Sequence, residues 1–196
     1  MKVVGLGDSL TYGYAVPSGE GWFDRMADYF PTLNWVNCGI PGDSTQGMLY
    51  RFERDVVQQK ADVVTILGGV NDLMSRASVD SVAERLIQIG ELAEEHGIIP
   101  FMLLPLSVSL YPGLAGWVTP KQAQLLHQQI IDLRKQIQIA VLKYKWCSFD
   151  LMSVAPDSDF LEECFLEDGV HVSSWLHKLI SQGLKNSELK NILLAP

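Results

Sequence analysis

The residues best suited to chemistry in this chain begin with Asp8 and Ser9, in the stretch VVGLGDSLTYGY. An apolar run leads into two glycines and then into the Asp-Ser pair, as where a strand turns into a helix. Such a turn places a serine hydroxyl at the edge of a sheet, with its N–H at a helix start where negative charge is favoured. The stretch indicates a nucleophile, but alone it is equally typical of a helix N-cap formed by Asp8 or Ser9.

The same loop fails to match two better-known motifs. Gly5 and Gly7 begin a G-x-G-x-x-G pattern, but Leu10 stands where the third glycine would be, and no Walker lysine follows. A G-x-S-x-G elbow fails as well, because Thr11 lies two positions after Ser9. What remains is a Gly-Asp-Ser-Leu turn.

A serine nucleophile needs a base, and the base needs a group that orients it. His171 stands in EDGVHVSS, three residues after Asp168. One turn of chain can bring the carboxylate to the imidazole Nδ1–H and leave Nε2 free to take a proton from Ser9. D-x-x-H is a weak signal by itself, and an exposed acidic loop containing a histidine gives the same pattern.

The other three histidines lie in predicted helices. His96 precedes Gly97, so we expect it to end a helix. His127 and His177 are expected at partly exposed helical positions. None of the three is expected to act as the base.

Two further loops offer hydrogen-bond donors for an oxyanion. NCGIPGDS places Gly39 and Gly42 where a backbone N–H could approach a ligand closely, and GGVNDL places the Asn71 amide after another strand. With the Ser9 N–H these make a candidate oxyanion hole, in which one donor contributes about 3 kcal/mol. Taken singly, the two loops are also typical of a Gly-Pro turn and an Asx turn. Ser44 repeats the Gly-Asp-Ser triplet, but it opens a predicted helix without a preceding apolar strand, so Ser9 is the expected nucleophile.

The elements that must position these groups alternate between short apolar runs and helical patterns. Strands are expected at residues 3–6, 35–37, 61–67, 98–104 and 148–151, and helices at 22–30, 44–59, 79–96, 119–144 and 173–184. This alternation predicts parallel βαβ units, with helices on both faces of one sheet. Ligands bind such sheets outside the carboxyl ends of the strands, which is where the candidate groups fall.

Composition narrows the class of protein further. With 196 residues, 47% of them hydrophobic, the chain can bury one core, and we expect a single domain over residues 1–196. A net charge of -8 argues against a partner such as nucleic acid. Cys38, Cys147 and Cys164 are widely spaced, which indicates reduced, mostly buried thiols rather than a disulfide framework or a zinc site.

Neither the start of the chain nor its uncharged segment indicates a membrane protein. The start of the chain has no apolar signal-peptide region, so we expect a cytoplasmic location. The uncharged segment 97–118 is about long enough to span a bilayer. It contains Pro100, Pro105 and Pro112, however, which indicate a strand and a loop rather than a membrane helix. We therefore expect no stable membrane insertion.

Four blocks, taken together and in order, carry a resemblance to a known family. They are GDSLTYG, NCGIPGDS, GGVND and DGVH. With these blocks the chain resembles the SGNH hydrolases, also called the GDSL esterase/lipase family. The resemblance implies a flavodoxin-like three-layer α/β/α sandwich with a five-stranded parallel sheet. It also implies a carboxylic ester hydrolase that acts on a small-molecule ester and uses no metal or organic cofactor.

The resemblance also implies a role for each candidate residue. Ser9 is the nucleophile, His171 the base and Asp168 the residue that orients the base. The oxyanion hole is then formed by Ser9 N–H, Gly42 N–H and Asn71.

The last block departs from the family pattern. Many members have Leu or Pro, then Asn, and soon a Gly after the catalytic histidine, whereas this chain has Val172 and Ser173 in HVSSWLHKL. Ser173 is still expected to cap the final helix.

Substrate identity is left open by the sequence. Tyr12 and Tyr14, with Leu110, Tyr111 and Trp117 of the loop 105–118, are predicted to line an apolar pocket for short to medium acyl chains. A dimer contact or core packing would use the same side chains, and the oligomeric state stays open. The family includes acetyl esterases acting on sugars, thioesterases and lysophospholipases. Outside the enzymes, a flavodoxin-like protein that binds a flavin or another small anion is the alternative.

Overall fold

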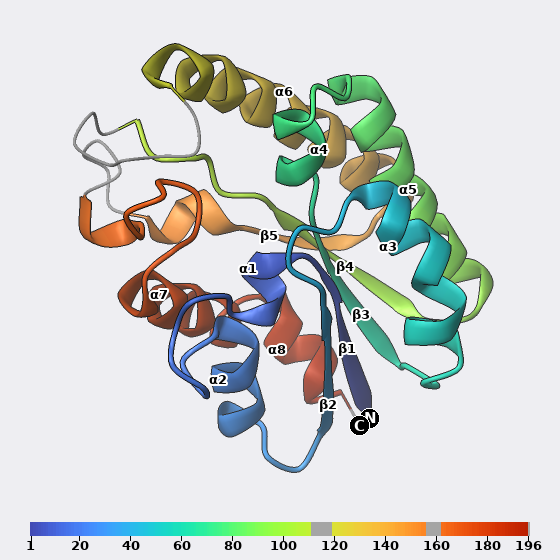
Figure 1. Cartoon of the computed structure of the whole chain (residues 1–196). Coiled ribbons are helices and arrows are strands. Elements are labelled where there is room, and N and C mark those ends of the chain that lie inside the picture. The colour runs from blue at the N-terminus through green and yellow to red at the C-terminus, as the bar shows by residue number, and fades with distance from the viewer. Residues whose placement is uncertain (111–118, 156–161, 196) are drawn as a thin grey trace.

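The protein is built around a parallel β-sheet covered by helices on both faces (Figure 1). The computed structural model describes residues 1–110, 119–155 and 162–195. Within that part the strands are β1 (Lys2–Gly7), β2 (Asn34–Gly39), β3 (Val63–Leu67), β4 (Ile99–Leu104) and β5 (Cys147–Asp150). They are arranged in the order β2-β1-β3-β4-β5, and each neighbouring pair is parallel. The predicted α/β sandwich with a five-stranded parallel sheet is confirmed.

The helices form two layers. One face of the sheet carries α3 (Thr45–Phe52), α5 (Val79–Glu95) and α6 (Pro120–Tyr144), and the other carries α2 (Trp22–Tyr29), α7 (Ser174–Lys185) and α8 (Glu188–Leu193) (Figure 1). The short segments are α1 (Ser9–Tyr12), α4 (Val70–Met74), the π-helical turn Glu53–Val57, and the 3-10 turns Leu151–Val154 and Glu162–Cys164.

The strand order creates a crevice at the carboxyl end of β1. The chain passes from β1 to the edge strand β2 and then returns to β3 on the opposite side of β1. The connections that follow β1 and β2 run over opposite faces of the sheet, so their loops separate at the strand ends (Figure 1). Such a switch point is where open α/β sheets bind ligands.

Burial follows the alternation of side chains along the strands. Val4 and Leu6 of β1 pack with the α3, α5 and α6 layer, whereas Val3 packs with the α2, α7 and α8 layer. All five residues of β3 are buried, as expected for a central strand covered on both faces. The sheet is therefore fixed from both sides.

Several local predictions agree with the structure, and three details differ. Thr119 and Gln122 form a capping box at the start of α6, and His96 ends α5. The helix predicted over 44–59 changes to a π-helical turn after Phe52. The helix that begins at Ser9, α1, has four residues, and the short helices α4 and α8 were not predicted. The thiols were expected to be mostly buried, but Cys38 and Cys147 are partly exposed.

Leu133 of α6 tests how much the helix layer contributes to stability. Its side chain is fully buried against the sheet, whereas Leu142 of the same helix is 76% exposed. Leu133→Ala should lower the free energy of unfolding by about 2–5 kcal/mol, because it leaves a cavity. Leu142→Ala should change it by no more than about 0.5 kcal/mol. Urea denaturation measures both, and equal losses would contradict this packing.

Candidate active site

Ser9 lies directly after β1, as the first residue of α1. Asp8, and not Ser9, caps this helix. Asp8 is the N-cap, because its Oδ1 accepts a hydrogen bond from the Leu10 N–H at 3.0 Å. The Ser9 hydroxyl is thereby left to face the crevice, where the residue is 7% exposed.

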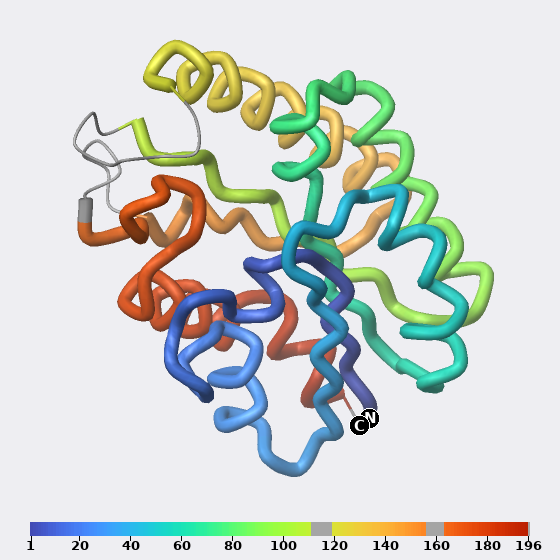
Figure 2. The backbone as a smooth tube through the Cα atoms, in the orientation of Figure 1, coloured from blue at the N-terminus to red at the C-terminus, as the bar shows by residue number. Residues whose placement is uncertain are grey.

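A chain of hydrogen bonds connects Ser9 to His171 and Asp168. Ser9 Oγ lies 3.0 Å from His171 Nε2, and His171 Nδ1 lies 2.7 Å from Asp168 Oδ2. The segment that carries the last two residues, just before α7, runs beside α1 in Figure 2, although the chain separates them widely. With Nδ1–H donating to the carboxylate, Nε2 can accept the serine proton.

The Asp168 carboxylate is held by its own turn. Its Oδ1 accepts hydrogen bonds from the Val170 and His171 N–H groups, both at 2.8 Å. Burial acts to raise the pKa of Asp168, but hydrogen bonds from the His171 ring and these two N–H groups lower it below its ordinary value. Asp168 therefore stays ionised at neutral pH and can orient the imidazole.

The turn around His171 is anchored to the neighbouring loop and helix. Gly169 accepts a hydrogen bond from the Ser109 N–H at 2.7 Å, which joins this turn to the loop after β4. Ser173 caps α7 by accepting from the Leu176 N–H at 3.3 Å, as predicted. The family departure at Val172 and Ser173 thus leaves the helix start intact.

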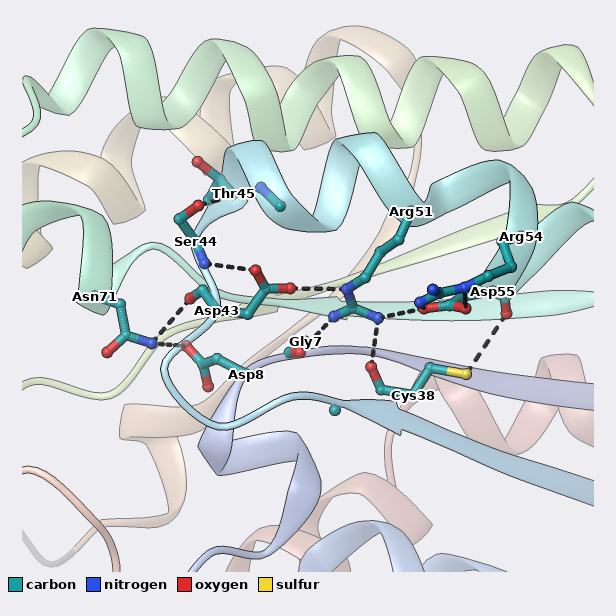
Figure 3. A network of polar contacts seen from close by, with 12 residues as sticks. Gly7, Asp8, Cys38, Asp43, Ser44, Thr45, Arg51, Arg54, Asp55 and Asn71 are labelled. Carbon is teal, nitrogen blue, oxygen red and sulfur yellow. Dashed lines mark hydrogen bonds and ion pairs between the residues drawn. The ribbon is translucent and has the colours of Figure 1, made fainter.

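Gly42 and Asn71 lie on the other side of the crevice. Asn71 Nδ2 donates to the Asp43 carbonyl at 2.9 Å and lies 3.5 Å from Asp8 Oδ2 (Figure 3). Gly42 has a φ of +79°, and a Cβ built there would meet no atom within 4 Å. The glycine allows this left-handed turn and leaves open space beside its backbone.

Gly39 has a different function from the one expected. Its N–H donates to Asn37 Oδ1 at 2.9 Å, so it is not directed at a ligand. A Cβ on Gly39 would lie only 2.3 Å from the Tyr12 backbone nitrogen. The absence of a side chain therefore lets α1 pack against the end of β2.

Asp72, next to Asn71, holds two helices together. Its Oδ2 accepts from the Thr45 N–H at 2.9 Å and its Oδ1 from the Thr45 hydroxyl at 2.8 Å. Arg85 of α5 neutralises the carboxylate at 3.1 Å. The start of α3, which follows Gly42, is thus fixed to α4, which carries Asn71.

A small cavity opens beside Ser9. It measures about 10 Å³ and is lined by Asp8, Ser9, Leu10, Val70, Asn71, Leu106, Ser107, Val108 and Val170. That volume accommodates roughly one water-sized group. Leu106 and Val108 come from the loop after β4, which was predicted to contribute to the pocket, and both are buried.

The predicted substrate residues are only partly brought together. The Tyr14 ring lies 4.6 Å from the His171 ring, centroid to centroid. Tyr12 instead lines a separate hollow of about 390 Å³ beside β2, and Leu110 is 44% exposed. Tyr111 and Trp117 lie outside the described residues. Of the two predicted tyrosines that the structure describes, Tyr14 is the one placed against the site.

His177 is buried, which corrects the prediction of a partly exposed position. It is 1% exposed, and its Nδ1 accepts from the Trp22 N–H at 3.2 Å, at the start of α2. The Trp22 indole in turn donates to the Leu10 carbonyl of α1 at 2.9 Å. Burial, with the charges of Arg25 and His171, lowers the pKa of His177 to about 4. The neutral imidazole thus connects α7 to the helix of Ser9.

His127, the other helical histidine, is half-buried and contacts the loop after β4. Its Nδ1 lies 2.6 Å from the hydroxyl of Ser107, which lines the small cavity. Sequence reasoning gave no signal for this pair, because the two residues come from different elements.

Comparisons with known proteins show the family to which the chain belongs. The sequence profile of the GDSL-like Lipase/Acylhydrolase family matches residues 6–179, and the chain belongs to this family. The protein is therefore a member of a hydrolase family, with the SGNH hydrolase fold.

Individual relatives extend the comparison. An arylesterase from Vibrio mimicus is 25% identical over 165 residues, which is 80% of this chain and 82% of that protein. An acetylxylan esterase from Geobacillus stearothermophilus is 31% identical over 105 residues, and this match spans about half of each protein. A crystal structure of a lipolytic G-D-S-L family member from Veillonella parvula has a TM-score of 0.78 at 22% identity, covering 95% of this chain and 97% of that one.

Over residues 1–110, 119–155 and 162–195, none of the helices has the length and apolar character needed to cross a membrane. In the same ranges, no group of three or more His, Cys, Asp or Glu side chains is placed to hold a metal ion.

Asp8 is a buried acid whose protonation should affect stability. Burial, together with the charges of Asp43 and Asp72, raises its pKa to about 7, against the Leu10 N–H that lowers it. The folded protein therefore binds this proton more tightly than the unfolded chain, and stability is lost as pH rises from about 4 to 7.

Asp8→Asn keeps a cap oxygen but removes the titration. The difference in free energy of unfolding between Asp8→Asn and wild type should grow by a few kcal/mol in favour of the variant from pH 4 to pH 8. Each unit of pKa shift corresponds to about 1.4 kcal/mol. Urea denaturation across this range measures the difference. The exposed Asp28→Asn is the control and should run parallel to wild type; a parallel Asp8→Asn curve would contradict the buried charge.

Proposed function

We propose that this chain is a serine esterase that hydrolyses carboxylic esters of short acyl groups, acetyl esters foremost, through an acyl-enzyme on Ser9. The observation that carries the proposal is the hydrogen-bonded series Ser9–His171–Asp168 at the carboxyl ends of parallel strands. Family membership and relatives named as esterases support the reaction class.

Acylation starts at the serine hydroxyl. Ser9 Oγ attacks the ester carbonyl carbon while His171 Nε2 takes its proton, and Asp168 stabilises the imidazolium that forms. The negative carbonyl oxygen is stabilised by the Ser9 and Gly42 N–H groups and the Asn71 amide. When this intermediate collapses, the C–O bond to the alcohol breaks and the alcohol leaves with the proton from His171.

Deacylation repeats these steps with water. His171 removes a proton from a water molecule as its oxygen attacks the acyl carbon. The second intermediate expels Ser9 Oγ, which recovers the proton, and the carboxylic acid is released. Histidine is thus base and acid in turn, and the chain returns to its starting state.

The cavity beside Ser9 supports a short acyl group. At about 10 Å³ it suits the methyl of an acetyl group better than an alkyl chain. A thioesterase or lysophospholipase for long chains needs a longer apolar groove than this cavity provides. We further propose that residues 1–196 form one hydrolase domain; a cytoplasmic location stays a prediction from sequence.

Ser9→Ala tests the nucleophile. It should lower kcat for p-nitrophenyl acetate by about 10⁴-fold or more, because the Ser9 hydroxyl is the group that lies 3.0 Å from His171 Nε2. Labelling by a fluorophosphonate should also be lost. Ser44 shares the Gly-Asp-Ser triplet but caps α3 through the Gly47 N–H at 3.1 Å. Ser44→Ala should therefore cost about 1 kcal/mol of stability and retain activity; the reverse pattern would overturn the assignment.

Val108→Ala tests the acyl cavity. Val108 is 1% exposed and lines the space beside Ser9, so its truncation should admit longer chains. The ratio of kcat/KM for p-nitrophenyl butyrate over acetate should rise about tenfold, a change that two methyl groups can bring.

The control for this change is Val141→Ala. Val141 is a buried core residue of α6 that does not line the cavity. Its truncation should lower stability without altering the ratio. An unchanged ratio in Val108→Ala would remove the cavity from acyl selection.

A further inference from the structure

Arg51 is a buried charge at the end of α3 whose contacts converge on the site. Its side chain is 6% exposed, and its guanidinium makes four short hydrogen bonds (Figure 3). Two of them go to backbone carbonyls and two to carboxylates. A planar guanidinium can hold several acceptors in fixed directions at once, which an ammonium group cannot.

The two carbonyls belong to the strand ends that lead into the site. Arg51 Nη2 donates to the Gly7 carbonyl at 2.8 Å, and Nη1 donates to the Cys38 carbonyl at 2.6 Å. Gly7 is two residues before Ser9, and Cys38 is four residues before Gly42. One side chain therefore joins the strand ends that carry the nucleophile and the glycine of the oxyanion hole.

Asp43 extends this connection to the third donor. Its Oδ2 accepts from Arg51 Nε at 2.7 Å, and its Oδ1 accepts from the Ser44 N–H at 2.9 Å. The Asp43 carbonyl accepts from Asn71 Nδ2 at 2.9 Å. Asp43 also directly follows Gly42, so the ion pair fixes the peptide beside Gly42 and the acceptor that orients Asn71 (Figure 3).

Asp55 provides an internal comparison. Its Oδ2 lies 2.8 Å from Arg51 Nη1, and its side chain is 13% exposed, against 14% for Asp43. The two ion pairs with Arg51 thus match in length and burial, and Asp55 is in addition paired with the exposed Arg54 at 2.6 Å. Asp55, however, lies in the π-helical turn after α3, and its backbone does not enter the site. If the guanidinium only needed neutralising, the two carboxylates would be equivalent.

We propose that Arg51 is a positioning residue, which holds the three oxyanion donors in register through the carbonyls of Gly7 and Cys38 and through Asp43. This inference rests on the proposed esterase function. Donors that are fixed before the reaction stabilise the oxyanion without reorganising. Because the oxyanion exists only near the transition state, loosening these donors lowers kcat and leaves KM nearly unchanged.

The matched variants Asp43→Asn and Asp55→Asn test the proposal. Each replaces one carboxylate partner of Arg51 with an amide of the same shape and keeps the backbone. Asp43→Asn should lower kcat for p-nitrophenyl acetate by about 10- to 100-fold, with KM within about threefold. The rate of fluorophosphonate labelling should fall in parallel, since that reaction also develops an oxyanion. Asp55→Asn should keep kcat within about threefold of wild type.

Thermal unfolding separates this effect from stability. We expect Asp55→Asn to lose at least as much Tm as Asp43→Asn, because Asp55 also pairs with Arg54. Equal kcat values for the two variants, or a raised KM with unchanged kcat in Asp43→Asn, would show a purely structural ion pair and overturn the inference. The proposed esterase function would still hold after that result, provided that wild type shows Ser9-dependent hydrolysis. A wild type without such hydrolysis would instead overturn both the proposed function and this one.

Discussion

The hydrogen bond between Ser9 and His171 is the contact on which the rest of the structure depends, because it joins residues 162 positions apart at 3.0 Å. No local preference can set such a distance. It requires the parallel sheet to place the end of β1 at the same edge as the turn before α7. It also requires α7 and α2 to pack together, and His177 accepts the hydrogen bond that fixes that packing.

Buried charge is the second constraint at this edge. Burial raises the pKa of Asp8, and the nearby charges of Asp43 and Asp72 raise it further. Arg51 pairs with Asp43, and Arg85 pairs with Asp72. Such pairs are costly to bury and contribute little net stability. Their value here is geometric, because the three carboxylates and the Arg51 guanidinium also hold backbone groups that lead into the site.

Much of the fold and the central site could be predicted because their signals are local. The apolar run of β3 and the capping residues at Ser78, Thr119 and Ser173 follow from nearby residues. The order of the strand-end loops then follows from parallel βαβ topology. Asp8 and Ser9 alone could not be told from a helix cap, and they indicated a nucleophile only together with the three later sequence blocks NCGIPGDS, GGVND and DGVH.

What could not be predicted depends on contacts between distant elements. His177 shares a face of α7 with Ile180, Ser181 and Leu184, a spacing that hinted at burial, but its partner Trp22 comes from α2. The four acceptors of Arg51 come from four separate positions between residues 7 and 55, and no local pattern brings them together. The position of Tyr12 could not be predicted either, because α1 ends after one turn and this residue lines a hollow beside β2.

The central claim is that an acyl group passes through Ser9. The most direct measurement mixes the protein with p-nitrophenyl acetate, quenches with acid on the millisecond scale and maps the acetylated peptide by mass spectrometry. The account predicts one acetyl group, on the peptide that contains Ser9, formed together with the first equivalent of nitrophenol. Acetyl on another residue, or steady turnover with no acetylated peptide at any quench time, would contradict it.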